Sequence, residues 1–112
     1  MKAFLILLML LSPAYAIDRA EWNPPTQYDH SFDGTIFLVR VPPERVGSMC
    51  GNLFELYDFN IKTSSKQRGC AIYIGRVCYV ITIDRPKYGT TPEAVFRHEQ
   101  GHCNGWPANH PE

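Results

Sequence analysis

Three of the four histidines in this chain lie within its last fifteen residues, in the stretch RHEQGHCNGWPANHPE. His98 and His102 are four residues apart, and Glu99 directly follows the first of them. On an α-helix this spacing places two side chains on one face, about one turn apart. Two imidazoles so arranged can bind one metal ion at about 2.0–2.1 Å. The motif H-E-x-x-H therefore predicts a metal site on a helix, with Glu99 beside the ligands and not among them.

A catalytic metal site usually has three protein ligands and leaves a fourth position for water. Cys103 points about 100° away from His102 on a helix, which favours a disulfide over metal binding. His110 is an imidazole on the segment that turns back after Gly105, and we predict it as the third ligand. The remaining nearby candidates are weak ligands or terminal: Asn104, Asn109 and Glu112.

Imidazole ligands suit Zn²⁺, and we expect one zinc ion per chain, although nickel or copper would also bind such a site. Zinc lowers the pKa of a bound water, a neighbouring carboxylate takes its proton, and the resulting hydroxide attacks a carbonyl group. Glu99 is the predicted general base.

The string HEQGHCNG, which begins at His98, resembles the start of the zincin metallopeptidase signature in its metzincin form, H-E-x-x-H-x-x-G-x-x-H. Ala108 stands where that pattern has its last histidine, His110 comes two residues later, and no methionine follows the motif. The longer string HExxHCNGWPxxH is similar to small exported zincin-like proteins of bacteria. The resemblance covers about the last twenty residues. It implies a zinc peptidase that hydrolyses peptide bonds in a peptide or protein substrate, with His98, His102 and His110 as ligands and Glu99 as base.

Two other functions are compatible with the same residues. One is hydrolysis of amide bonds in cell-wall peptide, and the other is a non-catalytic exported protein that binds a metal or a partner. A structural metal site gains nothing from a carboxylate beside its histidines, so Glu99 favours an enzyme. His30, which lies far from the motif, is predicted to be solvated and not a ligand.

The start of the chain predicts export. Met1-Lys2 is followed by the apolar run Ala3 to Leu11, and Ala14-Tyr15-Ala16 is typical of a signal-peptidase site. We expect residues 1–16 to be a signal peptide and residues 17–112 to form a single domain, periplasmic or secreted, with no membrane anchor after cleavage. Eleven basic residues balance eleven acidic ones with no basic run, which argues against a nucleic-acid partner. The sequence does not indicate an oligomeric state.

Four cysteines in an exported chain predict two disulfides, for which three connectivities are possible. A two-residue turn at Gly75-Arg76 would place Cys78 opposite Tyr73 and not opposite Cys70. This favours the pairs Cys50–Cys70 and Cys78–Cys103 without excluding the others.

The rest of the sequence predicts an α+β domain, a small antiparallel sheet with a C-terminal helix that carries the active site, as in a minimal zincin. Strands are expected at Thr35–Val41 and in a hairpin formed by Ala71–Ile74 and Val77–Ile83. Because zincins bind peptide substrates alongside an edge strand, the resemblance makes Val77–Ile83 a candidate edge strand for binding a substrate, and an ordinary strand is the alternative.

Two helices are expected as well. Proline in the first turn predicts a short helix that begins at Pro43 and stops before Gly51. Thr91-Pro92 predicts the start of the helix that carries the H-E-x-x-H motif. This helix is expected to run to Cys103, and Gly105 is expected to stop it. Trp106 is expected to pack the tail on this helix.

Overall fold

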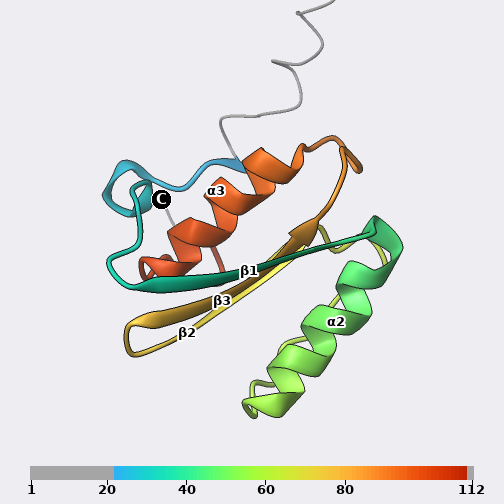
Figure 1. Ribbon diagram of the computed structural model, residues 1–112, viewed down its shortest axis with the longest axis horizontal. Helices are drawn as coiled ribbons and strands as arrows, with labels where there is room; N and C mark the ends of the chain where they lie inside the picture. Colours follow the sequence, from blue (N-terminus) through green and yellow to red (C-terminus); the bar gives the residue numbers. More distant parts are fainter. Residues whose placement is uncertain (1–21, 111–112) are drawn as a thin grey trace, which may run out of the picture.

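The computed structural model describes residues 22–110, so the predicted signal peptide lies outside the described residues. A sheet of three strands, β1 (Thr35–Val41), β2 (Gly69–Ile74) and β3 (Val77–Ile83), lies between two helices. Helix α2 (Pro43–Leu56) covers one face of the sheet and α3 (Pro92–Cys103) covers the other (Figure 1). The predicted α+β class is confirmed.

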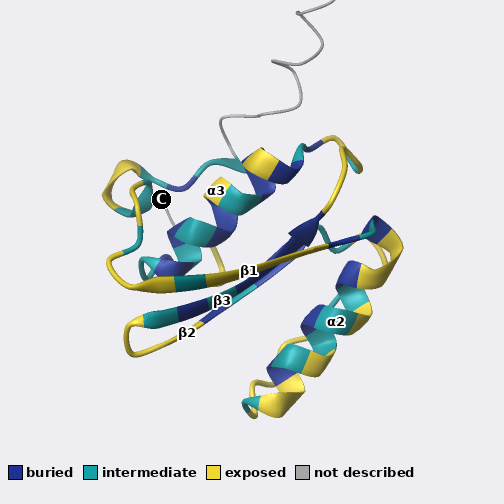
Figure 2. Cartoon of the chain, viewed as in Figure 1, coloured by how far each residue is buried: buried dark blue, intermediate teal, exposed yellow. Residues whose placement is uncertain are grey.

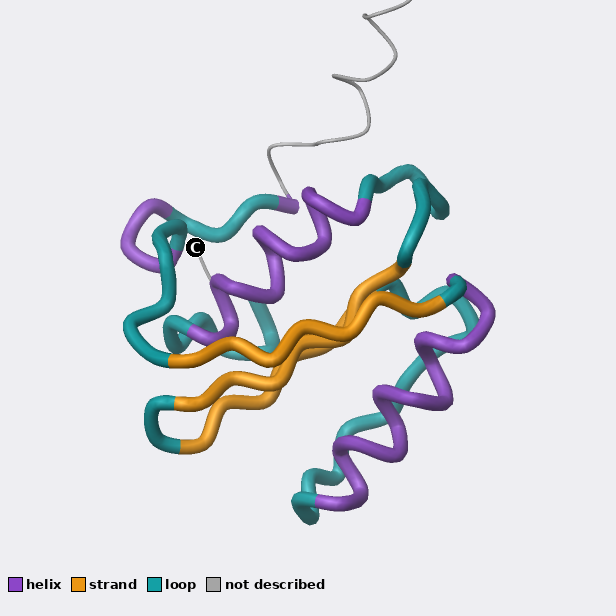
Figure 3. Tube along the Cα trace, in the orientation of Figure 1, coloured by secondary structure: helices purple, strands orange, loops and turns teal. Residues whose placement is uncertain are grey.

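The sheet is mixed, with strand order β1-β3-β2, and not purely antiparallel as expected. β2 and β3 form the predicted antiparallel hairpin, in which Tyr73 lies opposite Cys78. β1 pairs with β3 in parallel. Parallel strands need a long connection, and here the chain passes from β1 to β3 through α2, the segment 57–68 and β2 (Figure 3).

The interpretation of Val77–Ile83 as an edge strand is wrong, because β3 pairs with β1 on one side and β2 on the other. Its burial explains the position: five of its seven residues are buried. A nearly continuous apolar run is typical of a strand covered on both faces. The edge strands are therefore β1 and β2, and β1 is exposed along most of its length (Figure 2).

Helix α2 begins at Pro43 as predicted, but it continues through Gly51 to Leu56. The prediction that it would stop before the glycine is wrong, because Cys50 and Phe54 lie on the buried face of the helix and pack against the sheet on both sides of that position. Burial of an apolar face outweighs the helix propensity lost at one glycine, which is about 1 kcal/mol.

Helix α3 begins and ends as the sequence predicts. The Thr91 hydroxyl accepts a hydrogen bond from the Ala94 N–H at 3.1 Å, and Pro92 occupies the first turn. After the helix, Gly105 adopts a φ of 101°, the left-handed region in which glycine is favoured. The chain then reverses, and the Trp106 N–H donates to the Gly101 carbonyl at 3.0 Å.

The two favoured disulfides are both present. Cys50–Cys70 joins α2 to β2, and Cys78–Cys103 joins β3 to the last residue of α3. Both bonds are buried, one in each of the two apolar clusters that lie on opposite faces of the sheet. They indicate an oxidising environment. No helix within residues 22–110 has the length and apolar character needed to cross a membrane.

Candidate metal centre

His98, His102 and His110 come together at the C-terminal end of α3. Their Nε2 atoms lie 3.1 Å apart for His98–His110 and His102–His110, and 3.3 Å apart for His98–His102. Nitrogen ligands placed tetrahedrally at about 2.0–2.1 Å from a zinc ion lie roughly 3.3 Å from one another, close to these separations. Among the described residues, these three form the one cluster that could hold a metal ion.

Backbone carbonyls set the orientation of two of the three rings. His98 Nδ1 lies 2.6 Å from the Trp22 carbonyl oxygen, and His102 Nδ1 lies 2.7 Å from that of Trp106. Since a carbonyl oxygen can only accept, each Nδ1 carries the proton and donates it. In the neutral rings, Nε2 then presents its lone pair to the cluster, as a metal ligand must.

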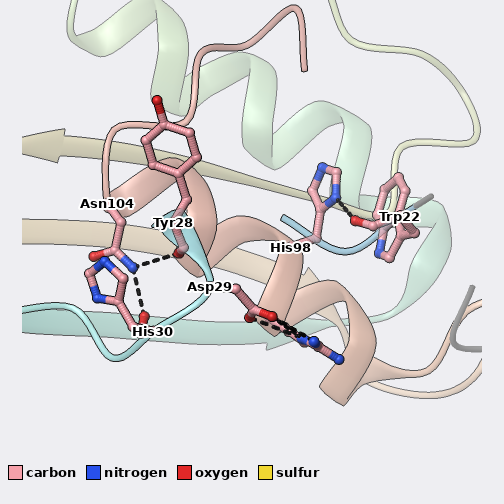
Figure 4. Close-up of polar contacts among 7 residues, drawn as sticks. Trp22, Tyr28, Asp29, His30, His98 and Asn104 are labelled. Carbon is pink, nitrogen blue, oxygen red and sulfur yellow. Dashed lines mark hydrogen bonds and ion pairs between the residues drawn. The ribbon is translucent and has the colours of Figure 1, made fainter. Parts of the chain in front are cut away.

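The same two tryptophans cover the rings that they orient. Trp22 stacks on His98 with ring centroids 3.6 Å apart, and Trp106 stacks on His102 at 4.8 Å. Figure 4 shows the Trp22 carbonyl and His98 side by side. Trp106 is only 5% exposed and packs the tail on the helix, which confirms the role predicted for it.

The environment keeps the three imidazoles neutral. Burial lowers the pKa of His98 to about 3, and the neighbouring charges of His102, His110 and Arg68 act in the same direction, whereas the hydrogen bond to Trp22 opposes them. Burial also lowers the pKa of His102 and that of His110. Neutral imidazole is the form that binds a metal, so no proton has to be removed before binding at neutral pH.

Glu99 is 5% exposed and lies on the side of α3 that faces β2. Gly69 makes room for it, because a Cβ at that position would lie 3.2 Å from Glu99 Cγ and 2.6 Å from Val95 Cγ1. Burial raises the pKa of Glu99 to about 8, and the positive charge of Arg68 opposes this. A dication close by would favour the ionised carboxylate.

The cluster opens onto a cleft of about 630 Å³. The three histidines and Glu99 line it, together with the two tryptophans and with residues of β2 and of the segment 57–68. This volume is within the range of small-molecule and peptide side-chain sites, roughly 300–1,000 Å³. The arrangement can thus hold a metal ion at the surface of a cleft with a carboxyl group beside it.

The remaining histidine stays apart from the cluster. His30 is exposed, and its Nδ1 lies 3.0 Å from the Ser31 carbonyl oxygen. Sequence reasoning missed Trp22 and Gly69. Trp22 lies 76 residues before His98 in the chain, and no local pattern relates the two. A glycine just before a cysteine at the start of a strand is a weak signal of close packing.

No family model, curated protein or solved structure matches the chain.

Proposed function

We propose that this protein is an exported zinc-dependent metallopeptidase, with His98, His102 and His110 as the metal ligands and Glu99 as the general base. The observation that supports it most is the convergence of three Nε2 atoms on the wall of a cleft that Glu99 also lines. The Nε2 atoms of His98 and His102 both present lone pairs and lie 3.3 Å apart, so they repel unless a cation or a donated proton lies between them.

Zinc bound by these ligands would supply a Lewis acid that polarises a substrate carbonyl and makes water more acidic. The roles of the chain's own groups follow from their places. The Trp22 and Trp106 carbonyls hold the His98 and His102 rings in the metal-binding tautomer. Glu99 accepts a proton from the attacking water and passes it to the leaving amine. Its position between α3 and β2 keeps bulk water from the carboxylate.

The substrate backbone would lie along β2. This strand lines the cleft, and β3 occupies only one of its two edges. An extended peptide can add to a free strand edge through main-chain hydrogen bonds, which bind any sequence. This replaces β3 as the candidate surface.

A non-catalytic metal-binding protein is the main alternative. The burial of Glu99 favours it, because a carboxyl group that is only 5% exposed has little access to a substrate. Metal binding alone would not distinguish the two, since both need the three histidines.

Hydrolysis distinguishes them. We expect Glu99→Gln to keep its zinc and to lose peptide hydrolysis by roughly 10²–10⁴-fold, the usual contribution of a general base. The matched control is Glu93→Gln, on the same helix with a side chain that is 79% exposed and outside the cleft lining. Hydrolysis of a mixed peptide pool, followed by mass spectrometry, is the readout. Equal cleavage by Glu99→Gln and the control would remove Glu99 from the mechanism.

A further inference from the structure

Large apolar side chains are exposed in the same cleft as the histidines. Phe59, Ile61 and Tyr73 are 45%, 44% and 51% exposed, and all three line it. Apolar side chains exposed together in a concave surface usually mark a binding site. They come from the segment 57–68 and from β2, so two separate parts of the chain contribute to one apolar wall.

This wall is held in place by contacts outside the metal centre. Cys50–Cys70 ties the start of β2 to α2, and Gln67 Nε2 donates to the Gly69 carbonyl at 2.8 Å. Gly47 of α2 lets the segment 57–68 approach closely, since a Cβ there would lie 2.8 Å from the Ser64 carbonyl oxygen. A site whose wall is fixed before binding loses less entropy when a ligand binds.

The charged residues of the same cleft are mostly basic. Lys66 and Arg68 line it, and Glu99 is the one acidic residue among the described residues that do so. The Arg68 Cζ lies 4.0 Å from the centre of the Trp22 ring, and that ring stacks on His98. Basic charge therefore lies next to the metal centre, and a bound dication would add to it. Such a cleft attracts a ligand that carries a negative charge.

We propose that the cleft selects peptide segments in which a large apolar side chain lies beside a carboxylate. The apolar side chain packs against Phe59 and Ile61, and the carboxylate lies near Lys66 and Arg68. The carboxylate can belong to an acidic side chain or to the C-terminus of the peptide. This inference rests on the proposed function, because it concerns the substrate of the same site.

The two tryptophans of the chain provide the test. Trp22 and Trp106 both line the cleft, so quenching or enhancement of intrinsic fluorescence reports peptide binding without any need for turnover. Zinc-loaded Glu99→Gln protein would be titrated with four peptides of equal length. The first contains leucine beside aspartate. In the second, serine replaces the leucine, and in the third, asparagine replaces the aspartate. These three peptides have amidated C-termini. The fourth contains leucine at a free C-terminus and no acidic side chain.

We expect the leucine–aspartate peptide to bind about tenfold or more tightly than the serine and asparagine peptides. Binding of the fourth peptide to a similar degree would assign the carboxylate to a C-terminus as well. Its failure to bind, with the first peptide tight, would assign the carboxylate to an acidic side chain. Equal affinity for the first three peptides would overturn the inference.

Variants locate the two contacts. The double variant Phe59→Ser/Ile61→Ser should abolish the preference for leucine, whereas Leu56→Ser should not, because Leu56 is 74% exposed and lies outside the cleft lining. Lys66→Gln should reduce the preference for the carboxylate, and Lys62→Gln in the same segment should leave it unchanged. A preference that persists in both cleft variants would also overturn the inference.

Failure of this inference and failure of the proposed function give different results. Selective binding by the Glu99→Gln protein with no hydrolysis by the wild type would support the cleft preference and contradict the peptidase. Hydrolysis without any preference between the peptides would contradict the cleft preference and support the peptidase.

Discussion

The metal-binding tautomers of His98 and His102 depend on main-chain atoms. The carbonyls of Trp22 and Trp106 accept their Nδ1 protons at 2.6 and 2.7 Å. A substitution at either tryptophan keeps the carbonyl and removes only the stacked ring. Substitutions of the tryptophan side chains should consequently affect the packing of the histidine rings more than their tautomers. Substitution of a histidine is therefore the more direct test of metal binding.

His110→Ala should lower zinc affinity sharply, because it removes one of the three proposed ligands. Wild-type protein is expected to retain about one zinc per chain after dialysis, as measured by elemental mass spectrometry, and the variant to lose most of it. His30→Ala is the matched control, since His30 is exposed and lies outside the cluster. No metal in wild-type protein that is folded and was offered zinc would contradict the metal centre.

The sequence alone predicted the separate residues of the site better than their surroundings. The spacing of His98 and His102 sets their geometry once the segment is helical, which needs no tertiary information. His110 could be predicted as the third ligand because the other nearby side chains are poor metal ligands. Trp22 could not be predicted, because its contact with His98 depends on how the first described segment packs across α3. That packing is a tertiary contact with no periodic signature.

At the scale of the elements, the sequence predicted boundaries correctly where capping residues mark them. It failed where packing against the sheet decides the boundary. Capping by Thr91 and the reversal at Gly105 set both ends of α3. The predicted end of α2 was wrong, because burial of its apolar face continues the helix past Gly51. The antiparallel sheet with Val77–Ile83 at an edge was wrong, because side-chain alternation describes the faces of a strand and says little about its neighbours in the sheet.

The segment before β1 packs on α3 at Gly101. A Cβ there would lie 2.7 Å from Pro24 Cβ and 3.2 Å from Trp106 Cε3. Gly101→Ala should therefore lower the free energy of unfolding by about 1–3 kcal/mol, despite the better helix propensity of alanine.

Gly51→Ala in α2 is the matched control, because its Cβ would meet only Thr63 Oγ1 at an ordinary 3.7 Å. It should raise the free energy of unfolding by about 0.5–1 kcal/mol. Urea denaturation of both variants measures the difference. Stabilisation by both substitutions would mean that Pro24 does not pack against Gly101.

An ion pair between Asp29 and Arg97 ties the same segment to α3, with Arg97 Nε 3.0 Å from Asp29 Oδ1. The hydrogen bond from Arg97 lowers the pKa of Asp29 below 3.8, and the charge of Arg97 adds to this. A lowered folded-state pKa means that the pair stabilises the fold above the unfolded pKa and that this contribution is lost as pH falls through the folded value.

Asp29→Asn should therefore lower the free energy of unfolding by about 0.5–1 kcal/mol at pH 7, the upper range for a partly exposed pair. The difference from wild type should disappear as the pH falls well below 3.8. Asp33→Asn is the control, because its pair with Arg76 is exposed at both ends. Denaturation midpoints measured from pH 7 to pH 2 test this, and a difference that does not change with pH would contradict it.

At the scale of the whole molecule, the disulfides and the proposed metal centre connect different parts. The disulfides fix α2 and α3 to the sheet, whereas the three histidines connect α3 only to the tail that follows it. Both apolar clusters form without the histidine side chains. Bound zinc should therefore add to the stability of a domain that is already folded, in contrast to small zinc domains that unfold when the metal is removed.

Chelation of the metal tests this division. With zinc at about 100 times its Kd, the metal should add about 2.7 kcal/mol to the free energy of unfolding, and a chelator should remove that increment without unfolding the protein. Thermal unfolding followed by circular dichroism, with and without chelator, measures it. The stability of His110→Ala should change little when zinc or a chelator is added, because its tail no longer supplies a metal ligand. Loss of the folded signal on chelation at room temperature would make the metal, and not the disulfide-linked sheet, the main source of stability.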